Sequence, residues 1–489
     1  MAESDRAIGF GARRGGAAAA RRFDLRAGDG ALSRRCRGTD SARSAACGAE
    51  PGGRGGAARL GGGDLSAGAE AVRVGLGIDL GTSGVRAVAI DAGGAVLGQG
   101  SARIAAENRR DPGSIWRAVG AALEVLCAST DPGAVDAIAV DGTSGTILAT
   151  DAKGAPLGPA SLYNDRAAPD AVARIAGVAP RDSAAHGETS PLGRMVSLLD
   201  RPGLAHVLHE ADWVAHRLGA PLGVSDANNT LKSGYDPVAG GWPGWIGRLG
   251  LDVSLLPRVV EPGVVIGAVG RDAAARFGFR ADARIVAGTT DGCASFLATG
   301  AARAGDGVTA LGSTLTLKLL SDRPVFAPNH GIYSHRLLGQ FLPGGAANAG
   351  AAVLAQFFAP ERIAELSARI DPARDSGLDY YPLPAPGERF PVNDPGLRPR
   401  LEPRPDDDAR FLHGLLEGLA RIEALGYRRL AELGAPPVRR VLTVGGGAVN
   451  PVWTALRARI LGVEVVAARQ TEAAYGTARL ALLGLASCG

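Results

Sequence analysis

Lysine is nearly absent from this 489-residue chain, which has only Lys153, Lys232 and Lys318 among its 53 lysines and arginines. This bias toward arginine is consistent with a GC-rich reading frame. None of the three lysines follows a G-x-x-x-x-G run, so a P-loop, whose lysine contacts the nucleotide phosphates, is excluded. A dinucleotide-binding fold is disfavoured because no G-x-G-x-x-G opens a βαβ unit.

Cysteine pairs and long apolar runs are also missing. The five cysteines form no C-x-x-C pair, which argues against a zinc site and a disulfide framework and favours a reducing compartment. The seven histidines show no metal-ligand spacing. No apolar stretch reaches the roughly 18 residues of a membrane span. We therefore expect a soluble, cytoplasmic protein with no membrane partner.

The net charge of +4 lies within residues 1–72, which hold 12 arginines and 8 acidic residues. The remaining chain is neutral and gives no electrostatic reason to expect a nucleic-acid partner. Residues 1–72 are rich in Gly, Ala and Arg and show neither helical nor strand periodicity, so we expect a disordered leader. It is either an upstream extension of the reading frame or a transit peptide, which would place the protein in a plastid or mitochondrion; its acidic residues fit a transit peptide poorly.

From residue 73 the pattern is that of an α/β protein with two similar halves, 73–280 and 281–489, and a cleft where strand ends meet. In the first half we expect strands at 74–79, 85–91, 95–104 and 135–141 and a helix at 114–126. In the second half we expect strands from 285 and at 306–311, 315–320, 440–444 and 463–466, and helices at 349–358, 409–432, 451–461 and 472–485. Eight prolines predict an irregular surface excursion over residues 382–405.

A tight turn rich in polar groups follows the first expected strand. Asp79 ends an apolar run and precedes Gly81-Thr82-Ser83-Gly84. The glycines let backbone N–H groups approach oxygens closely, the hydroxyls can donate to them, and the carboxylate can hold a divalent cation directly or through water. The turn therefore favours a metal-bound phosphate, with an ordinary hairpin as the alternative.

Several later motifs, taken together with this turn, resemble the FGGY carbohydrate kinases. They are Gly-Ile-Asp-Leu-Gly-Thr-Ser at 77–83, Ala-Gly-Thr-Thr-Asp-Gly at 287–292, Gly-Glu-Arg with Asn-Asp-Pro within 387–395, Val-Gly-Gly-Gly-Ala-Val-Asn-Pro at 444–451, and Thr-Glu-Ala-Ala at 471–474 with Gly476. The resemblance covers about residues 74–485. It implies two actin-like, ribonuclease-H-like ATPase domains, the first binding sugar and the second nucleotide, and transfer of the ATP γ-phosphoryl group to a sugar or polyol hydroxyl.

The same resemblance implies two catalytic carboxylates. Asp291 would accept the proton of the attacking hydroxyl, and Asp79 would hold Mg²⁺ or the sugar near the γ-phosphate, with Thr82 and Ser83 donating to phosphate oxygens. Both Asp79 and Asp291 would also contact the sugar. Without the other motifs, the favoured interpretation of Asp291 would be an aspartate that caps the turn before Gly292.

Two further glycine turns are implied to bind ATP. Gly312-Ser313-Thr314 matches the family's second phosphate loop, and Gly445 and Gly446 with Asn450 match its adenosine motif. A helix that begins near Pro451 would present its N-terminus to polar groups of the nucleotide. ATP and Mg²⁺ are therefore the expected cofactors.

Substrate identity depends on the turn Asp-Gly-Thr-Ser-Gly at 141–145. Xylulokinases usually carry Gln-Met-His-Gly there and glycerol kinases a loop with Arg-Glu, whereas this turn resembles the D-ribulose kinase group of cyanobacteria and plants. Ser144 could donate to a ketose hydroxyl or close an ST-turn on its own backbone. Asp165 matches the family's Trp-Asn-Asp near the sugar pocket. We expect D-ribulose as substrate, D-xylulose or a polyol as the alternative, and a monomer or homodimer.

Two other classes of protein remain open. A sugar or nucleotide sensor of this fold would bind ligands without turnover, and an actin- or chaperone-type ATPase would hydrolyse ATP without sugar. The presence of both Asp79 and Asp291 favours the enzyme.

Overall fold

The computed structural model describes residues 73–486, so the expected leader at 1–72 lies outside the described residues. The strands are β1 Val74–Leu80, β2 Gly84–Asp91, β3 Val96–Arg103, β4 Val135–Gly142, β5 Ile147–Thr150, β6 His206–His209, β7 Val224–Asp226, β8 Arg258–Val260, β9 Val265–Ala268, β10 Arg284–Thr290, β11 Asp306–Leu311, β12 Leu315–Leu319, β13 Tyr333–Leu337, β14 Gln340–Ala347, β15 Arg440–Val444 and β16 Glu464–Ala467. The α-helices are α1 Pro112–Cys127, α2 Pro169–Val178, α3 Pro191–Val196, α4 Glu210–Leu218, α5 Arg271–Phe277, α6 Asp291–Ala298, α7 Pro360–Ser367, α8 Asp408–Glu432, α9 Pro451–Leu461 and α10 Ala473–Ala486.

The first six-stranded sheet has the order β3-β2-β1-β4-β10-β9. Its first three strands form the antiparallel meander that the sequence predicted, and β1, β4 and β10 run parallel. α1 packs against β2 and β3; Asp111 caps its N-terminus by accepting from the N–H groups of Gly113 and Ser114. The buried stripe of α1 includes the predicted Ile115 and Val119. The βββαβ order expected for the first half is therefore present.

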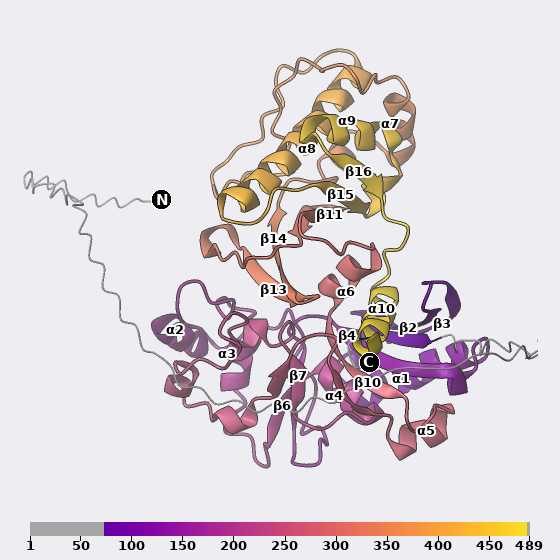
Figure 1. Ribbon diagram of the computed structural model, residues 1–489. Helices are drawn as coiled ribbons and strands as arrows, with labels where there is room; N and C mark the ends of the chain where they lie inside the picture. Colours follow the sequence, from indigo (N-terminus) through magenta and orange to yellow (C-terminus); the bar gives the residue numbers. More distant parts are fainter. Residues whose placement is uncertain (1–72, 487–489) are drawn as a thin grey trace, which may run out of the picture. The chain divides into compact units, whose positions relative to one another are not determined.

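The C-terminal helix α10 covers this same sheet, where it contacts β1, β2, β4 and β10. In Figure 1 the yellow α10 lies beside the strands of the N-terminal part. Two glycines of β1 make the close approach possible: a Cβ at Gly77 would lie 2.1 Å from the carbonyl oxygen of Ala474, and one at Gly75 would lie 2.6 Å from that of Ala478. The last segment of the chain thus helps to build the first sheet.

The strand from residue 285 also belongs to the first sheet, not to the second half in which the sequence placed it. β10 pairs with β4, with Ile285 opposite Ile138. Both of these side chains are fully buried. Hydrophobic periodicity identifies such a strand but not its partner. The expected division at residue 281 therefore does not coincide with the division between the two sheets.

The second six-stranded sheet has the order β13-β14-β12-β11-β15-β16, with β11, β15 and β16 parallel. α8 and α9 pack together beside it, and α8 starts at its N-cap Asp407. The expected helices at 409–432 and 451–461 and the strands at 306–311, 315–320 and 440–444 are confirmed within a residue or so. Figure 1 shows α8 and α9 grouped with β15 and β16.

The helix expected at 349–358 is wrong. Only a 3₁₀ turn, Leu354–Gln356, forms there. The N–H groups of Ala351 and Ala352 donate to the carbonyls of Gly312 and Ser313. These two N–H groups are therefore not available for the hydrogen bonds of a helix. This segment instead supports the turn at 312–314.

Residues 382–405 are irregular, as the prolines predicted, and contribute to neither sheet. They are nevertheless anchored, because the buried carboxylate of Glu388 accepts from the N–H groups of Asn348 and Ala349. Within residues 73–486 no helix is both long and apolar enough to cross a membrane.

Candidate active site

The carboxyl ends of β1, β4 and β10 bring three aspartates together. Asp79 is opposite Asp141 across β1 and β4, and Thr289 is opposite Asp141 across β4 and β10. Asp291 follows β10 directly and is the first residue of α6. Because the ends of parallel strands meet at one edge of a sheet, positions far apart in the sequence share one site.

Asp79 and Asp141 are both buried, with 5% and 0% of their surfaces exposed. Burial and then repulsion from Asp79 raise the pKa of Asp141 well above its usual range, although the hydroxyl of Thr477 donates to Asp141. The pKa of Asp79 is raised by burial and by the charge of Asp291, while its interactions with Asp141 and Arg86 lower it. Burial and the charge of Asp79 therefore favour the protonated form of Asp141.

The charge of Asp291 raises the pKa of Asp79, and the charges of two lysines act on Asp291. Burial raises its pKa, whereas a hydrogen bond of 2.6 Å from the N–H of Gly292 and the charges of Lys318 and Lys232 lower it. The described chain thus places two of its three lysines around this carboxylate. The arrangement gives a carboxylate that is basic enough to take a proton yet is stabilised by positive charge.

The turn after β1 leaves its hydroxyls available. The N–H of Gly81 donates to the carbonyl of Gly84 at 2.9 Å and closes the turn. Thr82 and Ser83 are exposed, and among the described residues neither side chain has a hydrogen-bond partner. Both hydroxyls can therefore donate to a ligand beside Asp79.

The two glycine turns expected to bind nucleotide lie next to each other. Gly312-Ser313-Thr314 joins β11 to β12, and Gly445 and Gly446 follow β15, the parallel neighbour of β11. A Cβ at Gly445 would lie 2.7 Å from the carbonyl oxygen of Leu311. The exposed backbone of both turns is therefore found at one edge of the second sheet.

The side chain of Asn450 has a structural role at this edge. Its Oδ1 accepts from the N–H of Trp453 at 3.0 Å, and its Nδ2 donates to the Ser367 hydroxyl at 2.9 Å. Asn450 thus caps α9, and its amide is engaged within the protein. The sequence did predict the helix start but not this capping bond.

Arg194 donates hydrogen bonds to the two segments that carry Ser144 and Asp165. Ser144 follows β4; the residue is half-buried, its hydroxyl oxygen is buried, and this oxygen has no hydrogen-bond partner among the described residues. Asp165 pairs with Arg110 through two hydrogen bonds of 2.6 Å and also accepts from the hydroxyl of Ser161. Arg194 donates to that hydroxyl and to the carbonyl of Gly145. Asp165 itself lies in a surface pocket with Arg110 and Arg194.

Sequence reasoning missed Asp141, Thr477, Lys232 and Lys318 as parts of the site. A signal existed for Asp141, because an apolar run followed by Asp-Gly recurs at 135–142 and 285–292. A signal also existed for the lysines, since a chain that uses arginine almost everywhere retains few of them. No local signal identified Thr477, which reaches Asp141 from α10.

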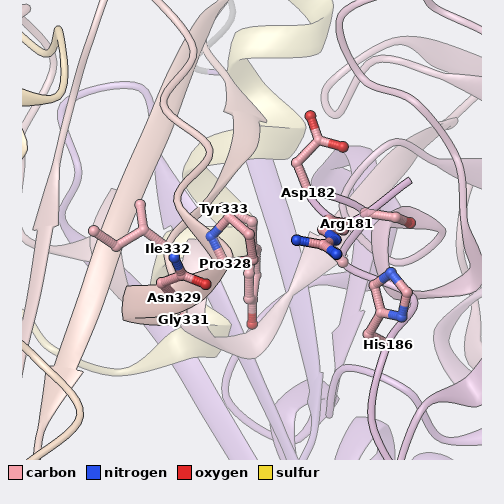
Figure 2. Close-up of a pocket in the computed structure, with 10 residues that line it drawn as sticks. Arg181, Asp182, His186, Pro328, Asn329, Gly331, Ile332 and Tyr333 are labelled. Atoms are coloured by element: carbon pink, nitrogen blue, oxygen red, sulfur yellow. The ribbon is translucent and has the colours of Figure 1, made fainter. Parts of the chain in front are cut away.

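A pocket of about 410 Å³ lies between residues 181–186 and residues 328–333. Figure 2 shows Arg181, Asp182 and His186 on one side and Tyr333 with its neighbours on the other. The ammonium of Lys232 lies 6.0 Å from the centroid of the Tyr333 ring. Lys232 therefore lies beside Tyr333 of this pocket, and its charge also acts on Asp291.

The fold resembles that of several solved sugar kinases. The xylulose kinase of Rhodospirillum rubrum matches with a TM-score of 0.71 at 22% identity, over 84% of this chain and 90% of that one. The gluconate kinase of Lactobacillus acidophilus matches with a TM-score of 0.72 at 17% identity, over 85% and 90%. These likenesses confirm the two-domain α/β fold with actin-like ATPase domains, and the fold is shared by kinases named for different sugars.

Sequence comparisons identify the family. Xylulose kinase of Streptomyces coelicolor is 28% identical over 434 residues, covering 83% of this chain and 87% of the relative. Autoinducer-2 kinase of Yersinia pestis is 25% identical over 288 residues, covering 52% of each. Residues 74–183 match the N-terminal domain of the FGGY family of carbohydrate kinases, and residues 300–485 match its C-terminal domain. The chain therefore belongs to the FGGY family of carbohydrate kinases and is a phosphotransferase that acts on a sugar.

Proposed function

We propose that this kinase phosphorylates a ketopentose, with D-ribulose as the first candidate and ATP as the phosphoryl donor. The observation that carries the proposal is that Asp79 and Asp291 lie at the carboxyl ends of β1 and β10, which run parallel on either side of β4 in one sheet. Phosphoryl transfer needs an aligned oxygen nucleophile, a proton acceptor and charge neutralisation around the moving group. This pair of carboxylates and the lysines beside it can supply the last two.

Asp291 is the proposed general base. A sugar hydroxyl attacks the γ-phosphorus, its proton passes to the Asp291 carboxylate, and the bond from phosphorus to the β-phosphate oxygen breaks, so that its electron pair leaves with ADP. Burial raises the pKa of Asp291, and a more basic carboxylate is a better acceptor at neutral pH. Burial favours the protonated form of Asp141, and its side-chain hydrogen bond with Asp79 favours the ionised form of Asp79 by lowering its pKa.

Asp79 is the proposed protein ligand of Mg²⁺. Its charge repels that of Asp291, and a dication near both carboxylates would offset this repulsion. Residues 73–486 contain no cluster of three or more His, Cys, Asp or Glu suited to a metal ion. One or two carboxylates are enough for Mg²⁺, which proteins commonly bind together with phosphate oxygens and water. When bound, the ion would neutralise charge on the phosphates.

ATP is proposed to bind along the two neighbouring glycine turns and the turn after β1. The exposed backbone of Gly312–Thr314 and of Gly445 and Gly446 permits close approach of phosphates and ribose. Thr82 and Ser83 supply hydroxyl donors beside Asp79. Asn450 contributes by fixing the start of α9, which orients the N-terminus of this helix behind the second glycine turn.

D-ribulose is proposed because of the turn after β4. The buried hydroxyl of Ser144 has no partner within residues 73–486, which suits a donor to a ketose hydroxyl, and Arg194 donates to the neighbouring carbonyl of Gly145. Asp165 belongs to the same hydrogen-bonded network and is proposed to orient the sugar side of the site through Ser161 and Arg194. D-xylulose is the second candidate, because the curated relatives include two xylulose kinases.

The test is coupled ADP release with D-ribulose, D-xylulose, L-ribulose, ribitol and glycerol, each at matched concentration. One ketopentose should give a kcat/KM at least tenfold above the others. A highest value for D-xylulose would replace the first candidate by the second. Equal ADP release with and without sugar would indicate an ATPase, and ATP binding without any ADP release would indicate a sensor.

A further inference from the structure

Lys318 occupies a position that links the proposed phosphate turn to Asp291. It lies on β12, which begins directly after Gly312-Ser313-Thr314. Alternate residues of a strand point to opposite faces. Leu315, Leu317 and Leu319 are buried in the core, whereas Thr316 and Lys318 are half-buried on the other face.

The ammonium of Lys318 lies over the first turn of α6. A Cβ built at Gly292 would be 3.0 Å from Lys318 Nζ, so this nitrogen is immediately beside the residue that follows Asp291. A larger residue than glycine at 292 would compete with the ammonium for this space. The charge of Lys318 also acts on Asp291.

Lys318 forms no ion pair within 4.0 Å among the described residues. Among residues 73–486 every ion pair within 4.0 Å uses an arginine or a histidine as the cation, and none uses a lysine. The Nζ of Lys318 also donates no hydrogen bond to the described residues, so its three N–H donors can bind an anion. The arrangement therefore favours an anion that binds next to Asp291.

We propose that Lys318 binds the phosphoryl group during its transfer from ATP to the sugar. The inference rests on the proposed function and assigns this residue to its site. The substrate oxygen forms a bond to the γ-phosphorus while the bond to the β-phosphate oxygen of ADP breaks. The hydroxyl proton goes to Asp291, and Lys318 keeps its proton and donates hydrogen bonds to the oxygens of the transferring group.

A lysine suits this task better than an arginine. Its ammonium is a compact point charge on a flexible stem, which can follow a group that moves from donor to acceptor. The planar guanidinium is better suited to a fixed, bidentate contact. Lys232 lies on the side of Tyr333 and the pocket of Figure 2, whereas Lys318 extends from the strand that follows the phosphate turn.

The test compares Lys318→Met with Lys153→Met, a control at an exposed lysine in the turn after β5. Thermal unfolding first shows whether each variant is folded, and Lys318→Gln replaces Lys318→Met if the latter is not. We expect Lys318→Met to lower kcat about 10²- to 10³-fold, as loss of one transition-state donor does. Lys318→Arg should recover part of this loss, and Lys153→Met should match the parent chain.

A second measurement separates binding of the transferring group from a structural role. Affinity is measured for ADP alone and for ADP with aluminium fluoride, which imitates the transferring phosphoryl group. Lys318→Met should weaken the second at least 30-fold and the first less than threefold. Equal weakening of both, or a kcat within threefold of the parent, would overturn the assignment of Lys318. Absence of sugar-dependent turnover in the parent chain would instead overturn the proposed function.

Discussion

Asp79 and Asp141 are direct neighbours across the parallel strands β1 and β4. Two carboxyl groups at one level of a sheet cannot both ionise without strong repulsion. Asp141 is fully enclosed, and its burial together with the charge of Asp79 favours its protonated form, even though it accepts a hydrogen bond from Thr477. Asp79 is the member nearer to the exposed turn at Thr82 and Ser83.

Asp141→Asn should therefore preserve the fold, because asparagine is a neutral isostere of the protonated acid. We expect its free energy of unfolding to stay within about 1 kcal/mol of the parent, whereas Thr477→Val, which leaves a buried oxygen unpaired, should lose about 1–3 kcal/mol. Urea denaturation of the two variants measures both values. A larger loss for Asp141→Asn than for Thr477→Val would mean that Asp141 is ionised in the folded state.

Gly476 is where α10 crosses α6. A Cβ there would lie 1.8 Å from the carbonyl oxygen of Ala294, so Gly476→Ala should force the helices apart and destabilise the protein by several kcal/mol. Gly177 in α2 is the matched control, because a Cβ there meets nothing within 4 Å. Gly177→Ala should be neutral or stabilise by up to about 1 kcal/mol. Thermal unfolding that ranks the two variants equally would contradict the close helix crossing.

Local sequence patterns predicted most of the elements that carry the site. Alternation and turn residues indicated β1 to β4, and the helix starts expected at 114, 409 and 451 lie within two residues of those in the structure. The polar turns at 82–83, 312–314 and 445–446 were also found, because glycine and hydroxyl residues after apolar runs are visible without a fold.

Long-range pairing could not be predicted from the same patterns. The periodicity of Ile285 and Val286 indicates a strand but does not show that its neighbour is β4. The helix expected at 349–358 failed because Ala351 and Ala352 bond to the 312–314 turn. Likewise, nothing near Lys318 in the sequence shows that its ammonium reaches Gly292. Periodicity does not show which residues share a site. Asp79 and Asp291 were predicted to share one because their motifs resemble those of the family.

Glu417 in α8 should make stability depend on pH in the acid range. Burial alone would raise its pKa, but the nearby His413 imidazole and hydrogen bonds from Ser376 and Arg459 outweigh this and lower the pKa to about 2. A carboxyl whose folded pKa lies below its unfolded value of 4.5 stabilises the fold above pH 4.5 and loses this contribution as the pH falls toward 2.

The size of this contribution can be measured against Glu417→Gln. The shift corresponds to about 3 kcal/mol at neutral pH. Urea unfolding of parent and variant between pH 7 and pH 3 should show a difference that shrinks as the pH falls. A difference that stays constant with pH would mean that Glu417 is not held ionised by its partners.

Asp79→Asn should weaken the binding of Mg²⁺ that turnover requires. Removal of one carboxylate charge should raise the Mg²⁺ concentration needed for half-maximal turnover at least tenfold, because the ion would lose its proposed protein ligand. Titration of Mg²⁺ at saturating ATP and sugar gives this value, and chelation should abolish turnover of the parent chain. An unchanged Mg²⁺ requirement in Asp79→Asn would show that the ion is bound without this carboxylate.

The most direct test of the account is the turnover of Asp291→Asn with the preferred ketopentose. Asparagine keeps the shape of the side chain and its place at the start of α6 but cannot accept the hydroxyl proton. Sugar-dependent ADP release should fall at least 10³-fold while the affinity for ATP changes less than threefold. A rate near that of the parent would show that Asp291 is not the base and would contradict the proposed mechanism.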